Sequence, residues 1–220
     1  MRSIPHQSTM PLSVSDGQSV QAFAMIVDIN GFTRMVVKGE DELIAQFTRD
    51  VLAGGITAVE HCGGEVVGFM GDAFYALLFD ADKVFECCTG IAKDLDEQCE
   101  YISQVQSESP VFSFSPGGPG LKIGIEYGWL EVSTISSNYL KEQQLFIGPA
   151  VNYASRITSA GKGNRCLFGP EAAKQGLDDY SHRGPFKVRG KAGEKLYTYF
   201  ELDLDDIWWT GGEGRTFWEG

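Results

Sequence analysis

The chain has 220 residues, of which 43% are hydrophobic, and its formal net charge is −12. This length suits one domain with a substantial core, and the negative charge argues against general binding to nucleic acid or to an anionic membrane. No apolar run of about 18 residues occurs, which predicts no direct membrane insertion. A small anionic substrate is not excluded, because metal ions or clustered Lys and Arg can offset the negative field.

The cysteines and the N-terminus indicate a reducing compartment. The five cysteines are an odd number, no C-x-x-C pair is present, and the three histidines are scattered. We therefore expect free thiols and no structural zinc site. The N-terminal residues lack the apolar stretch of a signal peptide, so a cytoplasmic location is expected.

The first half of the chain alternates strand and helix patterns. Residues 1–19 are rich in Ser, Gln and Pro and are expected to form a flexible leader. The apolar run Val20–Ile29 predicts a strand that enters a turn. Apolar positions at helical spacing predict a helix over residues 41–62, which Gly63–Gly64 ends.

A hairpin and a second helix are expected next. Two short apolar runs, residues 65–70 and 73–79, flank Gly71–Asp72 and predict a hairpin with an acid at its tip. Residues 80–106 have a helical pattern. Residues 107–120 are rich in Ser, Pro and Gly and predict a loop.

The second half predicts a strand pair, Leu121–Glu126 and Trp129–Thr134, around Tyr127–Gly128. A helix is expected over Ala150–Ala160. Phe186–Arg189 and Lys195–Glu201 predict a final hairpin. The order is βαββαβ with an extra C-terminal hairpin, which indicates an α+β, ferredoxin-like domain over residues 20–203, with helices on one face of the sheet. The Trp-rich tail, residues 204–220, has no firm placement.

Two carboxylates are placed for metal chemistry. Asp28 ends the first strand, and Asp72 lies at the tip of the first hairpin. In a ferredoxin-like sheet these strands are neighbours, so both side chains can converge and hold two Mg²⁺ or Mn²⁺ ions for chemistry on a triphosphate. The alternative is that both are turn acids that cap backbone amides.

Four segments, in order, resemble the class III nucleotidyl cyclases, the adenylate and guanylate cyclase family. Phe23–Thr33 resembles the first metal motif of that family, and Gly71–Ala76 resembles the second. Gly148–Arg156 is similar to its late helix, and Val188–Lys191 is similar to its basic hairpin. The resemblance covers about residues 20–203, and four motifs in the right order are far more specific than any one of them.

The resemblance implies roles for particular residues. Metal ions are expected at Asp28, Ile29 and Asp72; Asn152 would orient the ribose, and Arg156 would stabilise the transition state. Phosphate contacts are expected from Gly31, Phe32, Thr33, Arg189 and Lys191, with Arg189 preferred over Lys191. The alternative for Arg156 is a surface salt bridge on its helix. The family also implies a homodimer, in which one subunit supplies the aspartates and the other the Asn/Arg pair, giving two sites at the interface.

The positions that read the base in this family depart from its pattern. Adenylate cyclases typically have Lys, and guanylate cyclases Glu, where this chain has Gly68. The partner position, usually Asp or Thr for adenine and Cys for guanine, is Leu145. Neither purine pattern is present, and a site that lacks complementary polar groups selects a different base or selects weakly. Phe69 and Phe146 adjoin these positions and would narrow the pocket, unless both are core residues.

This combination resembles the stand-alone pyrimidine cyclases of bacterial Pycsar antiphage systems. The resemblance implies that UTP, or else CTP, becomes a cyclic nucleotide that a separate effector reads during phage infection. Two alternatives remain: an adenylate cyclase with an atypical base pocket, and a catalytically silent nucleotide-binding regulatory module. A diguanylate cyclase is rejected, because Gly63–Glu65 precedes a strand instead of forming a hairpin tip. A P-loop enzyme is rejected because the GxxxxGK[ST] motif is absent.

Overall fold

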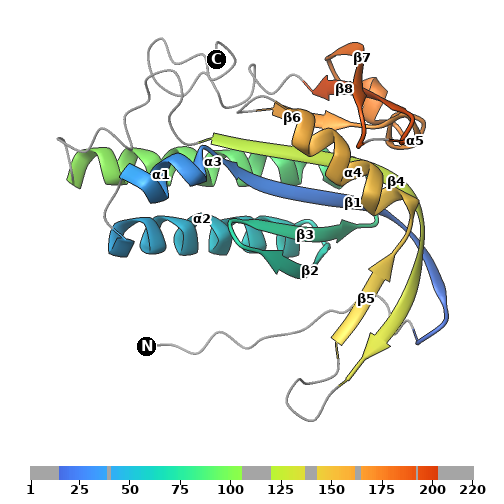
Figure 1. Ribbon diagram of the computed structural model, residues 1–220, viewed down its shortest axis with the longest axis horizontal. Helices are drawn as coiled ribbons and strands as arrows, with labels where there is room; N and C mark the ends of the chain where they lie inside the picture. Colours follow the sequence, from blue (N-terminus) through green and yellow to red (C-terminus); the bar gives the residue numbers. More distant parts are fainter. Residues whose placement is uncertain are drawn as a thin grey trace.

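The computed structural model of the chain describes residues 15–38, 41–105, 120–136, 143–161, 165–191 and 193–202. They form one mixed sheet with helices on both sides (Figure 1). Most of the expected leader, the loop expected at residues 107–120 apart from Gly120, and the Trp-rich tail lie outside these residues.

The strands are β1 (Ser19–Asn30), β2 (Glu65–Met70), β3 (Ala73–Leu78), β4 (Gly120–Ile135), β5 (Gln143–Ile147), β6 (Arg165–Phe168), β7 (His182–Arg189) and β8 (Leu196–Leu202). The helices are α1 (Phe32–Lys38), α2 (Asp41–His61), α3 (Ala81–Val105), α4 (Pro149–Ala160) and α5 (Pro170–Ala173), followed by a 3₁₀ turn, η1 (Leu177–Asp179).

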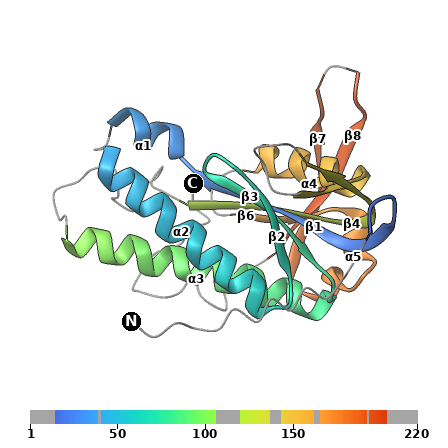
Figure 2. The same ribbon diagram turned by 90° about the horizontal axis from the view of Figure 1, so that it is seen from below.

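The sheet contains the predicted ferredoxin-like unit. Its strand order is β2-β3-β1-β4-β6-β8-β7, with β5 paired to β4, and the neighbours among β2, β3, β1 and β4 are antiparallel. β6 is parallel to β4, and the β7–β8 hairpin extends the sheet beyond it (Figure 2). The predicted α+β class and the predicted C-terminal hairpin are therefore confirmed.

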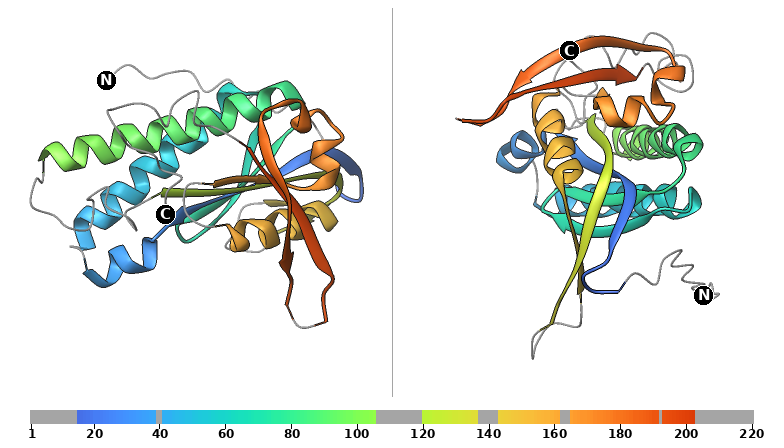
Figure 3. Two further views of the ribbon diagram at one scale, coloured as in Figure 1. Left: turned by 90° about the horizontal axis from the view of Figure 1, so that it is seen from above. Right: turned by 90° about the vertical axis from the view of Figure 1, so that its right-hand side faces the viewer.

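The helices lie on both faces of the sheet, so the expectation of helices on one face was wrong. Side chains of β1 alternate between two cores: Phe23 and Met25 pack with α2 and α3, whereas Ala22 and Ala24 pack with α4. Figure 3 shows α4 on the opposite side of the sheet from α2 and α3. A strand that is buried on both faces is apolar throughout and shows no alternation of polar and apolar residues. The sequence of β1 therefore does not indicate that both faces of the sheet are covered by helices.

β4 is one strand of 16 residues, so the turn predicted at Tyr127–Gly128 was wrong. Gly128 lies in register with Ala22 of β1, and a Cβ at Gly128 would meet Ala150 Cβ at 3.3 Å. A Cβ at Gly124 would lie 2.0 Å from Thr158 Oγ1. These glycines allow α4 to approach the sheet closely. Close approach of another segment is, besides a turn or bulge, a common reason for glycine in a strand.

The paired glycines inside α2 also serve close packing. A Cβ at Gly54 would lie 1.8 Å from Asp94 Oδ2 on α3, and one at Gly55 would lie 2.7 Å from the Phe74 ring. Glycine weakens a helix by about 1 kcal/mol relative to alanine, but here it brings α2 against α3 and β3. The helix predicted over residues 41–62 is therefore confirmed despite its glycines.

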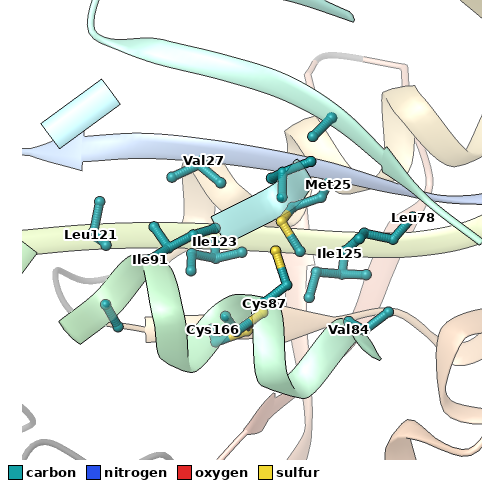
Figure 4. Packing of buried hydrophobic residues seen from close by; sticks show 14 of the residues in the cluster. Met25, Val27, Leu78, Val84, Cys87, Ile91, Leu121, Ile123, Ile125 and Cys166 are labelled. Carbon is teal, nitrogen blue, oxygen red and sulfur yellow. Dashed lines mark hydrogen bonds between the residues drawn. The ribbon is translucent and has the colours of Figure 1, made fainter. Parts of the chain in front are cut away.

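Four cysteines lie in the core between the sheet and helices α2 and α3. Cys87 packs near Met25 and Ile125 (Figure 4). Cys88 Sγ lies 3.5 Å from Cys166 Sγ. Burial raises the pKa of the Cys87 thiol far above its usual range. Cys62, Cys87, Cys88 and Cys166 are free, as predicted, and they are also buried, so they act as small hydrophobic residues.

Residues before the expected domain boundary also join the sheet. Gly17 N donates to Val132 O at 2.8 Å, and Thr134 N donates to the Asp16 carboxylate at 2.6 Å. The folded domain therefore includes residues 16–18. No helix among the described residues is long and apolar enough to cross a membrane.

Glu126 joins β4 to α5 from inside the protein. Its side chain is 3% exposed, and its Oε1 accepts hydrogen bonds from Tyr127 N at 2.9 Å and Ala172 N at 2.8 Å. Burial raises the pKa of this carboxyl to about 7, and the hydrogen bonds from backbone amides only partly oppose the effect.

This raised pKa predicts a pH-dependent stability. Below pH 4.5 the carboxyl is protonated in both states; between pH 4.5 and about 7 the folded state holds the proton more tightly than the unfolded state, so stability falls as pH rises. Between about pH 5 and 8, we expect the free energy of unfolding of the wild type to fall by about 2 kcal/mol more than that of Glu126→Gln. Urea unfolding of both proteins at several pH values measures the difference. If the free energy of unfolding depended on pH equally in both proteins, the raised pKa of Glu126 would be contradicted.

Candidate functional site

Asp28 and Asp72 meet where β1 passes the β2–β3 turn. Asp28 is in register with Ala73, the residue after Asp72, and Ile29 N donates to Asp72 O at 3.4 Å. Gly71, at φ 69°, makes the tight turn that directs Asp72 toward β1. Strand register and turn geometry together bring the two predicted carboxylates to one place.

The charges of the two aspartates interact. Partial burial raises the pKa of Asp72, and the nearby Asp28 carboxylate raises it further, while Lys122 acts in the opposite direction. Lys122 lies opposite Asp28 on β4, and its Nζ is 3.5 Å from Asp28 Oδ2. Two anions with one cation leave a local excess of negative charge.

Lys122 was missed by the sequence interpretation. A charged residue within the apolar run Leu121–Ile125 was the available signal, but only the register of β1 against β4 shows that it faces Asp28. Its ammonium group pairs with the Asp28 carboxylate.

The donor set fits a metal that is bound jointly with a phosphate. Among the described residues no group of three or more His, Cys, Asp or Glu side chains could hold a metal alone. Mg²⁺ commonly uses one or two protein carboxylates together with substrate phosphates, which is what Asp28 and Asp72 offer. The Ile29 side chain is 2% exposed and apolar, so only its main chain is suited to contribute.

The predicted phosphate-binding residues Gly31, Phe32 and Thr33 follow directly after β1. Gly31, at φ 81°, turns the chain into α1, whose first two residues are Phe32 and Thr33. Phe32 is half-buried against the main core, whereas Thr33 is exposed. The first amides of a helix have no acceptor within the helix, so this turn offers N–H donors beside the aspartates.

Asn152 and Arg156 lie one turn apart on α4, as predicted. Asn152 Nδ2 donates to the Tyr197 hydroxyl at 3.3 Å. Arg156 donates from Nε and Nη2 to the two oxygens of Glu194, at 2.9 and 2.6 Å. Arg156 therefore does form an ion pair, but its partner is on the β7–β8 hairpin and not on its own helix.

The two basic residues of the hairpin are placed differently. Arg189 ends β7 and is exposed, opposite Leu196. Lys191 N donates to Glu194 Oε2 at 3.0 Å, which brings the Lys191 backbone to the carboxylate that also holds Arg156. The preference for Arg189 as the phosphate contact stays a prediction.

Within one chain the two predicted groups remain separate. Among the described residues, no hydrogen bond or ion pair joins Asp28 or Asp72 to Asn152 or Arg156. A site that needs all four residues therefore requires either a ligand between them or a second subunit.

The positions expected to read the base have no polar side chain. Gly68 pairs with Tyr75, and a Cβ at Gly68 would have open space around it. Leu145 is 37% exposed on β5, which lies close to β2. Leu145 and Phe146 point to opposite sides of β5 because successive strand residues alternate.

The two phenylalanines differ from each other. Phe146 is buried in the core beneath α4, as the core interpretation predicted. Phe69 is 57% exposed and borders an apolar pocket of about 610 Å³ formed with α1 and α2. Because successive strand residues alternate, the Phe69 ring lies on the opposite face of β2 from Gly68. Phe69 faces away from the expected base position and Phe146 is buried in the core, so their placement does not support the prediction that they narrow a base pocket.

Comparison with protein families decides the classification. The adenylate and guanylate cyclase catalytic domain matches residues 16–201. The chain belongs to this family. The match extends over β1 to β8, so the carboxylate pair, α4 and the β7–β8 hairpin all fall inside the cyclase domain.

Related proteins are cyclases as well. An adenylate cyclase of Anabaena cylindrica is 29% identical in an alignment of 180 positions, which covers 76% of this chain and 34% of that protein. The chain thus spans about a third of the length of this relative.

Solved structures share the fold. The guanylyl cyclase Cya2 has a TM-score of 0.72 at 19% identity, covering 86% of this chain and 94% of its own. The adenylyl cyclase CyaB of P. aeruginosa has a TM-score of 0.71 at 19% identity, covering 84% and 95%. The cyclase fold predicted from four motifs is therefore confirmed.

Proposed function

We propose that this cyclase domain converts a pyrimidine nucleoside triphosphate, preferably UTP and otherwise CTP, into a 3′,5′-cyclic nucleotide and pyrophosphate. One observation carries the base assignment: Gly68 and Leu145 offer no hydrogen bond at the two positions where family members read a purine. Purine selection through buried polar groups needs such partners, so their absence favours another base.

The chain's own residues have distinct roles in this proposal. The ribose 3′-oxygen bonds to the α-phosphorus, the bond to the leaving pyrophosphate breaks, and the 3′-proton is lost. Asn152 orients the ribose, and Arg156 donates hydrogen bonds to the phosphate oxygens on which charge develops. The amides of the Gly31–Thr33 turn, together with Arg189 or Lys191, bind the remaining phosphates.

Asp28, Asp72 and the Ile29 main chain would hold two divalent ions, Mg²⁺ or Mn²⁺. Bound ions of this kind lower the pKa of the attacking hydroxyl and neutralise phosphate charge. Lys122 restrains Asp28 from the neighbouring strand and keeps the carboxylate directed at this site.

We also propose a homodimer with two sites at its interface. The separation of Asp28 and Asp72 from Asn152 and Arg156 within one chain supports this arrangement. Exposed apolar side chains of β4 and β5 supply surface for the contact: Trp129 is 60% exposed, Ile135 47% and Ile147 58%. Twofold symmetry then makes both sites identical.

In the cell, this protein would act in the cytoplasm as the source of a second messenger in antiphage defence. A separate effector that binds the cyclic nucleotide would read the signal. This part of the proposal follows from the resemblance to Pycsar cyclases and from the missing purine readers.

An adenylate cyclase with an atypical pocket is the second candidate, because the Anabaena cylindrica relative carries that name. Restoring the adenine pattern tests the base pocket directly. We expect Gly68→Lys with Leu145→Asp to lower pyrimidine turnover and to raise the share of cyclic AMP, since open space surrounds Gly68 and Leu145 is partly exposed. An unchanged product distribution would show that these two positions do not select the base.

A further inference from the structure

The β7–β8 hairpin connects the two α4 residues to each other. The Glu194 carboxylate accepts both hydrogen bonds from Arg156, and the Tyr197 hydroxyl donates to Glu194 Oε2 at 3.3 Å. The same hydroxyl accepts from Asn152 Nδ2 at 3.3 Å. A continuous chain of hydrogen bonds therefore runs from Asn152 through Tyr197 and Glu194 to Arg156.

The hairpin is shaped to hold Glu194 in this place. A Cβ at Gly190 would lie 2.2 Å from Glu194 Oε2 and 2.7 Å from the Tyr197 ring, so only glycine leaves room for the carboxylate. Lys191 N donates to the same oxygen.

Tyr197 is fixed by packing as well as by hydrogen bonds. It is 5% exposed, and its ring meets the Tyr153 ring edge-on, with the centroids 4.9 Å apart. Tyr153 in turn bonds to the β8 backbone at Thr198 through both the carbonyl and the amide. The hydroxyl that links Asn152 to Glu194 is thus held by the core between α4 and β8.

The ion pair between Arg156 and Glu194 can hold Arg156 in place before a substrate binds. The hydrogen bond from Arg156 lowers the pKa of Glu194, which keeps the carboxylate ionised at neutral pH. Arginine has five N–H donors, and Glu194 takes two of them, so donors remain for a phosphate. A free arginine loses considerable rotamer entropy when it is ordered, whereas one already held does not.

We propose that Glu194 and Tyr197 are positioning residues, which hold Arg156 and Asn152 in the geometry that the cyclisation step needs. This inference rests on the proposed function, because it concerns the same reaction. Removing a group that orients a functional side chain typically lowers activity by about 10- to 100-fold.

The test compares Glu194→Gln and Tyr197→Phe with wild type, using whichever triphosphate the wild type converts fastest. We expect Glu194→Gln to lower kcat about 10- to 100-fold with a nearly unchanged KM, and Tyr197→Phe to lower kcat less. Glu171→Gln is the matched control, because Glu171 is also paired, with Lys174 at 2.7 Å, but is exposed on α5. Circular dichroism and thermal unfolding show whether each variant is folded. If Glu194→Gln does not fold, Glu194→Asp is used in its place.

A double-mutant cycle separates positioning from a purely structural role. If Glu194 acts through Arg156, Glu194→Gln adds little loss in an Arg156→Ala background. An equal loss in both backgrounds, or an unchanged or raised kcat for Glu194→Gln alone, would overturn the proposal. A raised kcat would mean that Glu194 restrains Arg156 from acting.

A readout without activity separates this inference from the proposed function. The ¹⁵N-labelled wild type should give a protected Arg156 Nε–H signal, assigned by its loss in Arg156→Lys, and Glu194→Gln should broaden or remove it. Cyclic AMP as the wild-type product would overturn only the base assignment, leaving the Glu194 result valid. A wild type that cyclises no triphosphate would overturn the proposed function and the catalytic role of Glu194, even if the signal were present.

Discussion

Replacing Asp72 by Ala should lower cyclic-nucleotide formation by about a thousandfold or more, because charge stabilisation at the reacting phosphate contributes several kcal/mol to catalysis. Asp72, in the β2–β3 turn, lies beside Asp28 of β1, and among the described residues no third His, Cys, Asp or Glu joins them to form a metal-binding group. Removing one carboxylate should also relieve repulsion with the other, so folding should be unharmed.

The measurement is the initial rate of product formation by chromatography, at several Mn²⁺ concentrations. Asp178→Ala is the matched control, because Asp178 is exposed in the short turn η1. A fully active Asp72→Ala protein with a wild-type unfolding transition would refute the metal-binding role.

Arg156→Ala should lower kcat by about 100- to 1000-fold, the usual cost of losing a donor that stabilises developing charge. Arg49→Ala, which removes an exposed arginine from α2, should leave the rate unchanged. If Arg156 formed only a structural ion pair with Glu194, its loss would reduce thermal stability while leaving kcat near the wild-type value.

Mixing the two inactive proteins tests the shared site. In an equal mixture of Asp72→Ala and Arg156→Ala subunits, half of the dimers are mixed, and each mixed dimer has one intact site out of two. We expect recovery of about a quarter of wild-type activity. No recovery, under conditions in which subunits exchange, would show that each chain supplies all four residues to its own site.

Local patterns predicted much of this domain from sequence. The hairpin with Asp72 at its tip follows from two apolar runs around Gly71. The helix expected over Ala150–Ala160 places Asn152 and Arg156 on one face, because they are four residues apart. Ferredoxin-like strand order then brings Asp28 beside Asp72, so the carboxylate pair was predictable from topology.

Contacts that depend on register or on distant segments were not predictable. Lys122 meets Asp28 only because of the register between β1 and β4. Glu194 reaches Arg156 across 38 positions of sequence, through a loop whose shape depends on Gly190. Gly128 resembled a turn signal, although its role is close packing against α4; a glycine alone does not distinguish these two uses.

Direct competition among the four nucleoside triphosphates shows which base this cyclase domain selects. Purified wild-type protein is incubated with Mn²⁺ and an equimolar mixture of ATP, GTP, CTP and UTP, and the cyclic products are separated and quantified. We predict cyclic UMP as the main product, with cyclic CMP next and the cyclic purine nucleotides as minor products. Cyclic AMP or cyclic GMP as the dominant product would contradict it.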